Sequence, residues 1–148
     1  MPGIIGIIAK TPASDFAASL RTMVCAMMRE DFYTSTEIVD RESGFYLASI
    51  AIKDSFADCL PHAQGREDLA LLLSGECYST GNSADASPGR ITAEHLLRLY
   101  EEGRDSFFGG VNGWLSGVLL DRNNRKVILF NDRYGMQRVY YHEGKDAF

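Results

Sequence analysis

Apolar and polar residues alternate in short stretches that predict strands, with two helices between them. Residues 3–9 are almost all aliphatic and are bounded by prolines, so we predict a strand buried on both faces. Helical spacing of apolar residues predicts a helix over residues 15–28, with Ser14 as its N-cap. The apolar stripe of this helix consists of Phe16, Leu20, Met23, Val24 and Met27.

The later elements follow from the same patterns. Strands are predicted over residues 36–39, 45–52, 68–74, 114–121, 126–132 and 139–142, with turns at 41–44 and 122–125. Gly75 is expected to end the third of these strands, and residues 79–89 form the best candidate for a loop. A second helix should start at 91–92 with Thr92 as its cap and end at Gly103. Its buried face should comprise Leu96, Leu97 and Tyr100.

The order of elements predicts the fold class. Strands joined by hairpins, with two helices between groups of strands, favour α+β architecture with antiparallel sheets and the helices outside. The 148 residues are enough for one domain, and no internal boundary is apparent, so we predict a single domain over residues 1–148.

Composition and charge exclude several classes of function. Hydrophobic residues make up 45% of the chain, as in globular proteins, and the formal net charge is −5. Lysine and arginine do not cluster, so neither nucleic acid nor a membrane surface is an expected partner. The apolar run at 3–9 is too short to cross a bilayer and no basic segment precedes it.

Metal and disulfide chemistry also lack a sequence signal. The three cysteines are scattered without a CxxC spacing, which argues against zinc or a disulfide framework and favours the cytoplasm. The three histidines have no partner at helical spacing, so we expect no metal site and no cofactor. They are His62, His95 and His142.

Three stretches in register carry a family resemblance. The chain opens Met-Pro-Gly-Ile-Ile-Gly at residues 1–6, and residues 73–78 read Leu-Ser-Gly-Glu-Cys-Tyr. The longest stretch contains Val-Asn-Gly-Trp at 111–114, Asp-Arg-Tyr-Gly at 132–135 and Val-Tyr-Tyr at 139–141. Their order and spacing resemble the N-terminal glutaminase domain of the asparagine synthetase family, a class II glutamine amidotransferase, over nearly the whole chain.

The resemblance implies a fold and a chemistry. The fold would be that of N-terminal-nucleophile hydrolases, a four-layer αββα sandwich in which two antiparallel sheets face each other. In that family, a cysteine at position 2 becomes N-terminal and attacks the glutamine amide, with its own α-amino group as general base. An asparagine side chain and the next glycine N–H hold the oxyanion. An arginine binds the substrate carboxylate and an aspartate its α-amino group.

The catalytic positions of this sequence depart from the family pattern. Pro2 occupies the nucleophile position and has neither thiol nor hydroxyl, so no acyl-enzyme can form there. Ser74 stands where the oxyanion asparagine would be, while Gly75 is kept.

The expected substrate-binding positions depart as well. Leu47, or its neighbour Tyr46, stands at the position of the arginine, and Thr92 at that of the aspartate. Glu76 is kept from the family's Asn-Gly-Glu segment. The sequence therefore predicts vestigial oxyanion and substrate sites.

The retained motifs have a structural interpretation. Asn112-Gly113 and the Asp132–Gly135 stretch are expected at turns, where glycine supplies unusual backbone angles and Asp or Asn accepts bonds from nearby amides. An ion pair between Asp132 and Arg133 is expected in addition. Cys77 is expected to be a packing residue and not a replacement nucleophile.

These observations lead to one main hypothesis and two alternatives. The chain would be a degenerate glutaminase-like domain, unable to hydrolyse glutamine and serving a structural or partner-contacting role. Its partner would be a C-terminal synthetase domain or a separate protein. The first alternative is a functional amidotransferase in which Pro2 is engineered or the start is mis-assigned. The second is a tautomerase in which Pro2 acts as the base.

The segment 142–148 suggests how the chain assembles. It breaks off inside what should be another hairpin, so we expect a trimmed domain or an N-terminal fragment of an asparagine-synthetase-like protein. An edge strand left unpaired would invite a homodimer.

Overall fold

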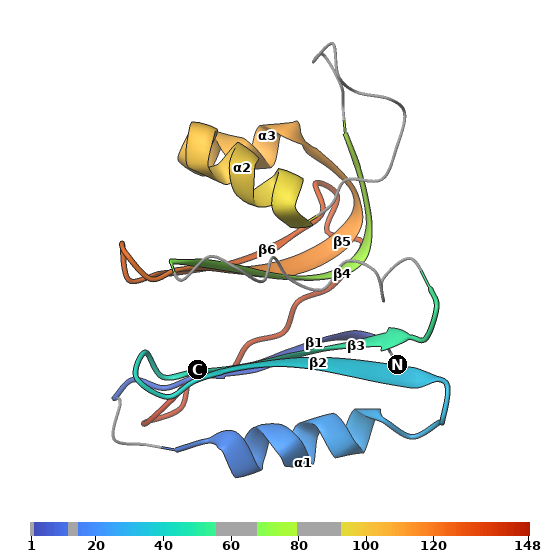
Figure 1. Cartoon of the computed structure of the whole chain (residues 1–148), viewed down its shortest axis with the longest axis vertical. Helices are drawn as coiled ribbons and strands as arrows, with labels where there is room; N and C mark the ends of the chain where they lie inside the picture. The colour runs from blue at the N-terminus through green and yellow to red at the C-terminus, as the bar shows by residue number, and fades with distance from the viewer. Residues whose placement is uncertain (1, 12–14, 56–67, 80–92) are drawn as a thin grey trace.

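The computed structural model describes residues 2–11, 15–55, 68–79 and 93–148 (Figure 1). The strands in these ranges are β1 (Gly3–Ile8), β2 (Tyr33–Asp40), β3 (Phe45–Ile52), β4 (Leu69–Ser79), β5 (Val111–Asp121) and β6 (Lys126–Asn131). The helices are α1 (Ala17–Met27), α2 (Ala93–Gly103), the 3-10 turn η2 (Arg104–Ser106) and α3 (Phe107–Gly110).

The strands form two antiparallel sheets that lie face to face. One sheet has the order β1-β3-β2 and the other β4-β5-β6. Helix α1 covers the outer face of the first sheet, and α2 with α3 covers the outer face of the second (Figure 1). The predicted α+β class and the antiparallel sheets are confirmed, and the layering is compatible with the predicted four-layer sandwich.

Alternation along the strands produces three apolar layers. Odd residues of β4 pack under α2 and even residues face the other sheet, because successive side chains point to opposite faces. The layer between the sheets contains the buried residues Phe45, Leu47, Ala70, Leu72, Val118 and Leu120. An ion pair closes one side of this layer, where Arg122 Nε lies 2.8 Å from Asp40 Oδ2.

Helix α1 is slightly shorter than predicted. Asp15 Oδ1 accepts a hydrogen bond from the Ala17 amide at 2.9 Å, which satisfies one of the free donors at the helix start. The proposed cap Ser14 lies outside the described residues. Leu20 and Val24 are buried as predicted, but the inclusion of Met23 in the buried stripe was wrong, because its side chain is 37% exposed.

Helix α2 agrees better with the prediction. Leu96, Leu97 and Tyr100 are buried, and the α-helix ends at Gly103. The proposed cap Thr92 and residues 80–89 of the predicted loop lie outside the described residues. The helical turns η2 and α3 that follow were not predicted.

Two predicted strands need correction. The aliphatic run at residues 3–9 forms β1, but its side chains are mostly half-buried, because β1 lies at the edge of its sheet and not in the centre. Residues 139–142 form no strand; Tyr140 and Tyr141 are about four-fifths exposed, at 82% and 80%. This segment instead crosses from one sheet to the other (Figure 1).

The C-terminal residues return to the edge of β1. Ile8 and Phe148 exchange two backbone hydrogen bonds of 3.0 and 2.9 Å, and the Lys10 amide donates to the Asp146 carbonyl at 2.8 Å. Lys10 Nζ also contacts Glu143 Oε1 at 2.7 Å and lies 4.7 Å from the centre of the Phe148 ring. Among the described helices, none is long and apolar enough to cross a membrane.

Candidate functional site

Gly75 lies inside β4 and does not end the strand, contrary to the prediction. It pairs with Leu115 of β5, and its φ of +105° is one that residues with a side chain rarely adopt. A Cβ at this position would collide with the carbonyl oxygen of Trp114 and lie 2.9 Å from the Leu115 Cα. The backbone conformation and the lack of room for a Cβ therefore require glycine at position 75, independently of any role in ligand binding.

Asn112-Gly113 lies in β5 and not in a turn, which corrects a second prediction. Gly113 pairs with Cys77 and has a φ of +152°, and a Cβ there would collide with the carbonyl oxygen of Glu76. The close approach of two backbones explains this glycine, as it explains Gly75.

Ser74 and Glu76 lie on the face of β4 that is turned toward the other sheet. Ser74 is 8% exposed and pairs with Ser116, whereas Glu76 pairs with Trp114 and is exposed. The Tyr78 hydroxyl donates a hydrogen bond to Glu76 Oε2, and this bond raises the pKa of Tyr78. Along β4, the apolar residues Ala70 and Leu72 between the sheets are thus followed by the exposed Glu76 and Tyr78.

Leu47 and Tyr46 both lie in the interior, on opposite faces of β3. Leu47 belongs to the layer between the sheets and packs over Gly6, where a Cβ would overlap its Cδ2 atom. Tyr46 faces α1 and packs edge-to-face on Phe16, with ring centres 6.0 Å apart. Neither side chain can supply the charge-assisted bonds that an arginine would form with a carboxylate.

Pro2 and Thr92 complete the predicted set. Pro2 is exposed and directly precedes β1, while Thr92 lies outside the described residues. The structure brings Ser74, Gly75 and Glu76 together because they are consecutive on β4. Among the described residues, no hydrogen bond or ion pair joins these three to Pro2 or Leu47, so their joint role as a site remains a prediction.

The Asp132–Gly135 motif builds a turn after β6. Asp132 Oδ1 accepts hydrogen bonds from the amides of Tyr134 and Met136 at 3.0 Å, and Oδ2 accepts one from Gln137 at 2.7 Å. These amide bonds, that of Gln137 first, hold the pKa of Asp132 below its ordinary value. Asp132 therefore stabilises this turn through hydrogen bonds from backbone amides, which is the structural role expected from the sequence.

The ion pair predicted between Asp132 and Arg133 is wrong. Arg133 Nη2 instead lies 3.4 Å from the carbonyl oxygen of Gly109, toward which it donates. The carboxylate of Asp132 is engaged by backbone amides that converge on it, and these satisfy it without a cation.

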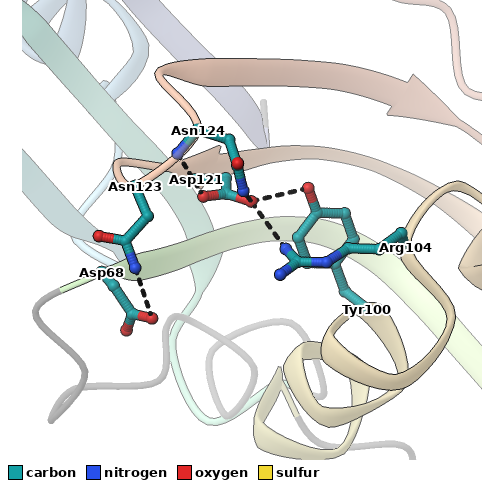
Figure 2. Close-up of polar contacts among 6 residues, drawn as sticks. All are labelled: Asp68, Tyr100, Arg104, Asp121, Asn123 and Asn124. Atoms are coloured by element: carbon teal, nitrogen blue, oxygen red, sulfur yellow. Dashed lines mark hydrogen bonds and ion pairs between the residues drawn. The ribbon is translucent and has the colours of Figure 1, made fainter.

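A buried carboxylate network, which the sequence did not reveal, fixes α2 on its sheet (Figure 2). Asp121 is 2% exposed, and its Oδ2 accepts hydrogen bonds from Tyr100 Oη at 3.0 Å, Arg104 Nη1 at 3.0 Å and Asn124 Nδ2 at 2.8 Å. The Asn124 amide donates to Oδ1 at 3.0 Å. Arg104 reaches Asp121 from a backbone with a φ of +47° and stacks 5.3 Å from the Tyr100 ring centre.

The protonation of this network follows from its contacts. Burial alone would raise the pKa of Asp121, but the hydrogen bonds from Asn124 and Tyr100 and the charge of Arg104 outweigh burial and lower it. Burial and the bond to Asp121 raise the pKa of Tyr100. Asp121 is therefore a carboxylate at neutral pH and Tyr100 its donor.

The histidines show no sign of a metal site in the part of the chain that the structure describes. His95 on α2 contacts Arg98, His142 is exposed, and His62 lies outside the described residues. Within the described ranges, no cluster of three or more His, Cys, Asp or Glu residues could hold a metal ion.

Cys77 should be inert toward thiol reagents in the folded protein. It is 1% exposed, and burial raises the pKa of its thiol to about 11. Only roughly one thiol in a thousand is then a thiolate at pH 8. We expect the exposed Cys25 to react with iodoacetamide while Cys77 reacts only after denaturation. Peptide mass mapping distinguishes the two, and rapid native labelling of Cys77 would contradict its role in packing.

Comparisons with known proteins give a distant relationship. No family model matches the sequence, and no solved structure matches it. The chain is 25% identical over 112 residues to the glutamine-hydrolyzing asparagine synthetase 2 of Bacillus subtilis (strain 168), covering 72% of this chain. It is 27% identical over 151 residues to the glutamine-hydrolyzing asparagine synthetase of Sandersonia aurantiaca, covering 96% of this chain. The aligned regions span 15% and 29% of the lengths of these two relatives. These similarities support a relationship between the chain and the asparagine synthetases.

Proposed function

We propose that the chain is a glutaminase-type domain of an asparagine-synthetase-like protein, with the N-terminal-nucleophile hydrolase fold but without the glutaminase reaction. It would serve as a structural or partner-contacting module. The observation that carries the proposal is Pro2, which stands at the position of the nucleophilic cysteine and offers no thiol. Replacing that cysteine removes the acyl-enzyme route entirely.

The surroundings of the proposed pocket support a loss of substrate and oxyanion contacts in addition to the loss of the nucleophile. Leu47 packs in the apolar layer over Gly6, so the position assigned to the substrate-binding arginine is filled by a buried aliphatic side chain. An arginine restored there would enter the interior, where an unpaired charge is costly. Ser74 at the asparagine position removes a side-chain amide donor, and one oxyanion donor is worth about 2.7–4 kcal/mol of transition-state stabilisation.

Glutamine binding should be lost together with hydrolysis. A charge-assisted hydrogen bond contributes roughly 1.5–3 kcal/mol, so losing two of them weakens binding by at least a hundredfold. We expect no heat of glutamine binding in a calorimetric titration with millimolar ligand, and no release of glutamate in a coupled assay. Release of glutamate at the rate of an ordinary glutaminase would refute the proposal.

The functional amidotransferase remains the main alternative. It requires that the natural chain carries a different N-terminus, because Pro2 cannot act as the nucleophile. Sequencing the N-terminal peptide of the protein from its natural source distinguishes the two possibilities. A cysteine as the first residue would favour the active enzyme.

The tautomerase alternative receives less support from the structure. A proline base needs apolar surroundings that lower the pKa of its amine, whereas Pro2 is exposed. The same preparation can be tested with a phenylpyruvate-type substrate. Enol–keto conversion that disappears in Pro2→Ala would favour this alternative over the main proposal.

A further inference from the structure

The pairing registers arrange the side chains between the two sheets in rows across the strands. Directly paired residues lie on the same face of a sheet, and the next residues on that face come two positions along each strand. The first row contains Phe45 on β3 and Ala70 on β4, and the second contains Leu47 and Leu72. The rows can be counted from the β2–β3 turn toward the opposite end of the sandwich, where β1 begins (Figure 1).

Both sheets change from apolar to polar at the same row. The first two rows supply every residue that forms or packs against the apolar layer between the sheets, except Ile4. In the third row, Ser49 occupies the central strand of the first sheet, and Ser74 pairs with Ser116 on the central strand of the second. The outer strands add Ile4, Thr36 and Asn131 to this row.

The ties between the sheets that the structure describes lie at the apolar end. Asp40, a first-row residue of β2, binds Arg122 of the β5–β6 turn, and the two side chains are only 19% and 25% exposed. The Arg122 amide also donates to the Asp68 carbonyl, next to the start of β4, at 2.8 Å. The C-terminal segment, which follows β6, pairs with Ile8 in the same first row. Apolar packing, an ion pair and backbone hydrogen bonds therefore act together at this end.

The third row holds the sheets together less strongly. An aliphatic side chain stabilises a packed layer in proportion to the apolar area that it buries, whereas a serine buries little and must give up hydrogen bonds to water. Ser49 and Ser74 are nevertheless only 5% and 8% exposed. Parts of a protein with few buried apolar contacts open at a lower free energy than the whole domain unfolds. The closed arrangement around these two serines should accordingly be the easier one to open.

We propose that the sandwich opens locally at the end where β1 begins, about a hinge formed by the first two rows and the Asp40–Arg122 ion pair. In the open state the sheets separate at the third row and expose Ser74, while Ala70 in the first row stays covered. The strands stay paired within each sheet, because the motion separates side chains that face each other and breaks no hydrogen bond of a ladder. The inference uses only register, burial and contacts, so it does not rest on the proposed function.

Thiol labelling of two matched variants tests the proposal. Ser74 and Ala70 are small residues on the same face of β4, with exposed fractions of 8% and 7%. Iodoacetamide should label Ser74→Cys about tenfold faster or more than Ala70→Cys, each rate being divided by that of the same thiol in the denatured chain. Peptide mass mapping separates these thiols from the native cysteines. Labelling of Ser74→Cys should depend weakly on denaturant, since local opening exposes little surface, and labelling of Ala70→Cys steeply.

Equal normalised rates with the same steep denaturant dependence would overturn the proposal, because both thiols would then react only through global unfolding. Ser49→Cys provides an independent reporter on the facing sheet, in case the change at Ser74 disturbs the fold. Ser49 lies in the same row and is 5% exposed, so its variant should show the fast, weakly denaturant-dependent labelling as well.

The hinge is tested by removing its ion pair. Asp40→Asn in the Ala70→Cys background should speed labelling at position 70, because the tie that keeps the first row closed is weakened. Asp15→Asn is the matched control, since Asp15 and Arg41 form an ion pair 3.4 Å long in which both side chains are 61% exposed and which does not join the sheets. No acceleration by Asp40→Asn, or the same acceleration by both variants, would contradict the assignment of the hinge.

Discussion

Replacing Asp121 by alanine should lower the free energy of unfolding by about 3 kcal/mol, because it breaks a buried network and leaves its donors without an acceptor. Asp121 is the only acceptor shared by Tyr100, Arg104 and Asn124 in the network of Figure 2. For a domain of this size the melting temperature should fall by roughly 10 °C. Chemical denaturation measured by circular dichroism gives the free energy directly.

Asp68 provides the matched control. Its carboxylate lies beside the same hairpin, but its contact with Asn123 Nδ2 is long, at 3.4 Å, and exposed (Figure 2). Asp68→Ala should change the stability by no more than about 0.5 kcal/mol. Equal effects of the two substitutions would show that the buried network does not stabilise α2 on its sheet.

Gly75→Ala should destabilise the fold by about 3 kcal/mol. The added Cβ would collide with the Trp114 carbonyl oxygen, and alanine would have to adopt a φ of +105°. The strained backbone and the overpacking each cost roughly 1–3 kcal/mol, and backbone atoms cannot move aside as a flexible side chain can.

Gly109→Ala is the control for this substitution. A Cβ at Gly109 has no atom within 4 Å, and the residue lies in the short helix α3, where alanine is the better helix former. This variant should be as stable as the original chain or slightly more so. If Gly75→Ala were equally well tolerated, the explanation of Gly75 by the close approach of the β4 and β5 backbones would be wrong.

Local patterns were enough to predict several of the elements, among them β4 and α2. The run Leu69–Leu73 and the helical spacing of Leu96, Leu97 and Tyr100 gave the right elements, because each pattern has the period of one type of structure. The position of an element in the sheet was harder to predict. The aliphatic sequence of β1 predicted a strand buried on both faces, yet β1 lies at an edge of its sheet, since strand order depends on contacts between distant segments.

Close approaches of the backbone were also hidden in the sequence. The sequence suggested that Gly75 ends a strand and that Gly113 lies in a turn. Instead, both glycines lie inside strands, where they allow the backbones of β4 and β5 to approach each other closely. Of the Asp121 network, only the bond within the hairpin could be anticipated, from an aspartate followed three residues later by Asn124. The donors Tyr100 of α2 and Arg104 of the 3-10 turn η2 are distant from the hairpin in sequence and come from helical segments that pack on the sheet.

The candidate site was predictable only as a set of positions taken from the family resemblance. The structure gives chemical environments to these positions: Leu47 in the apolar layer, Ser74 nearly buried on β4, and Pro2 exposed before β1. Local patterns could not predict how these positions are arranged, because Pro2 precedes β1 while Leu47 lies on β3 and Ser74 on β4, and these strands belong to two different sheets.

Glutamate release by the Pro2→Cys variant tests the central claim most directly. Pro2→Ala serves as the control without a thiol, and the intact mass of both variants verifies that the initiator methionine has been removed. The account predicts that Pro2→Cys hydrolyses glutamine no faster than Pro2→Ala, because Leu47 and Ser74 leave the proposed pocket without its carboxylate and oxyanion contacts. Turnover at about 1 s⁻¹ or faster, in the range of ordinary enzymes, would contradict it and show that the pocket is intact.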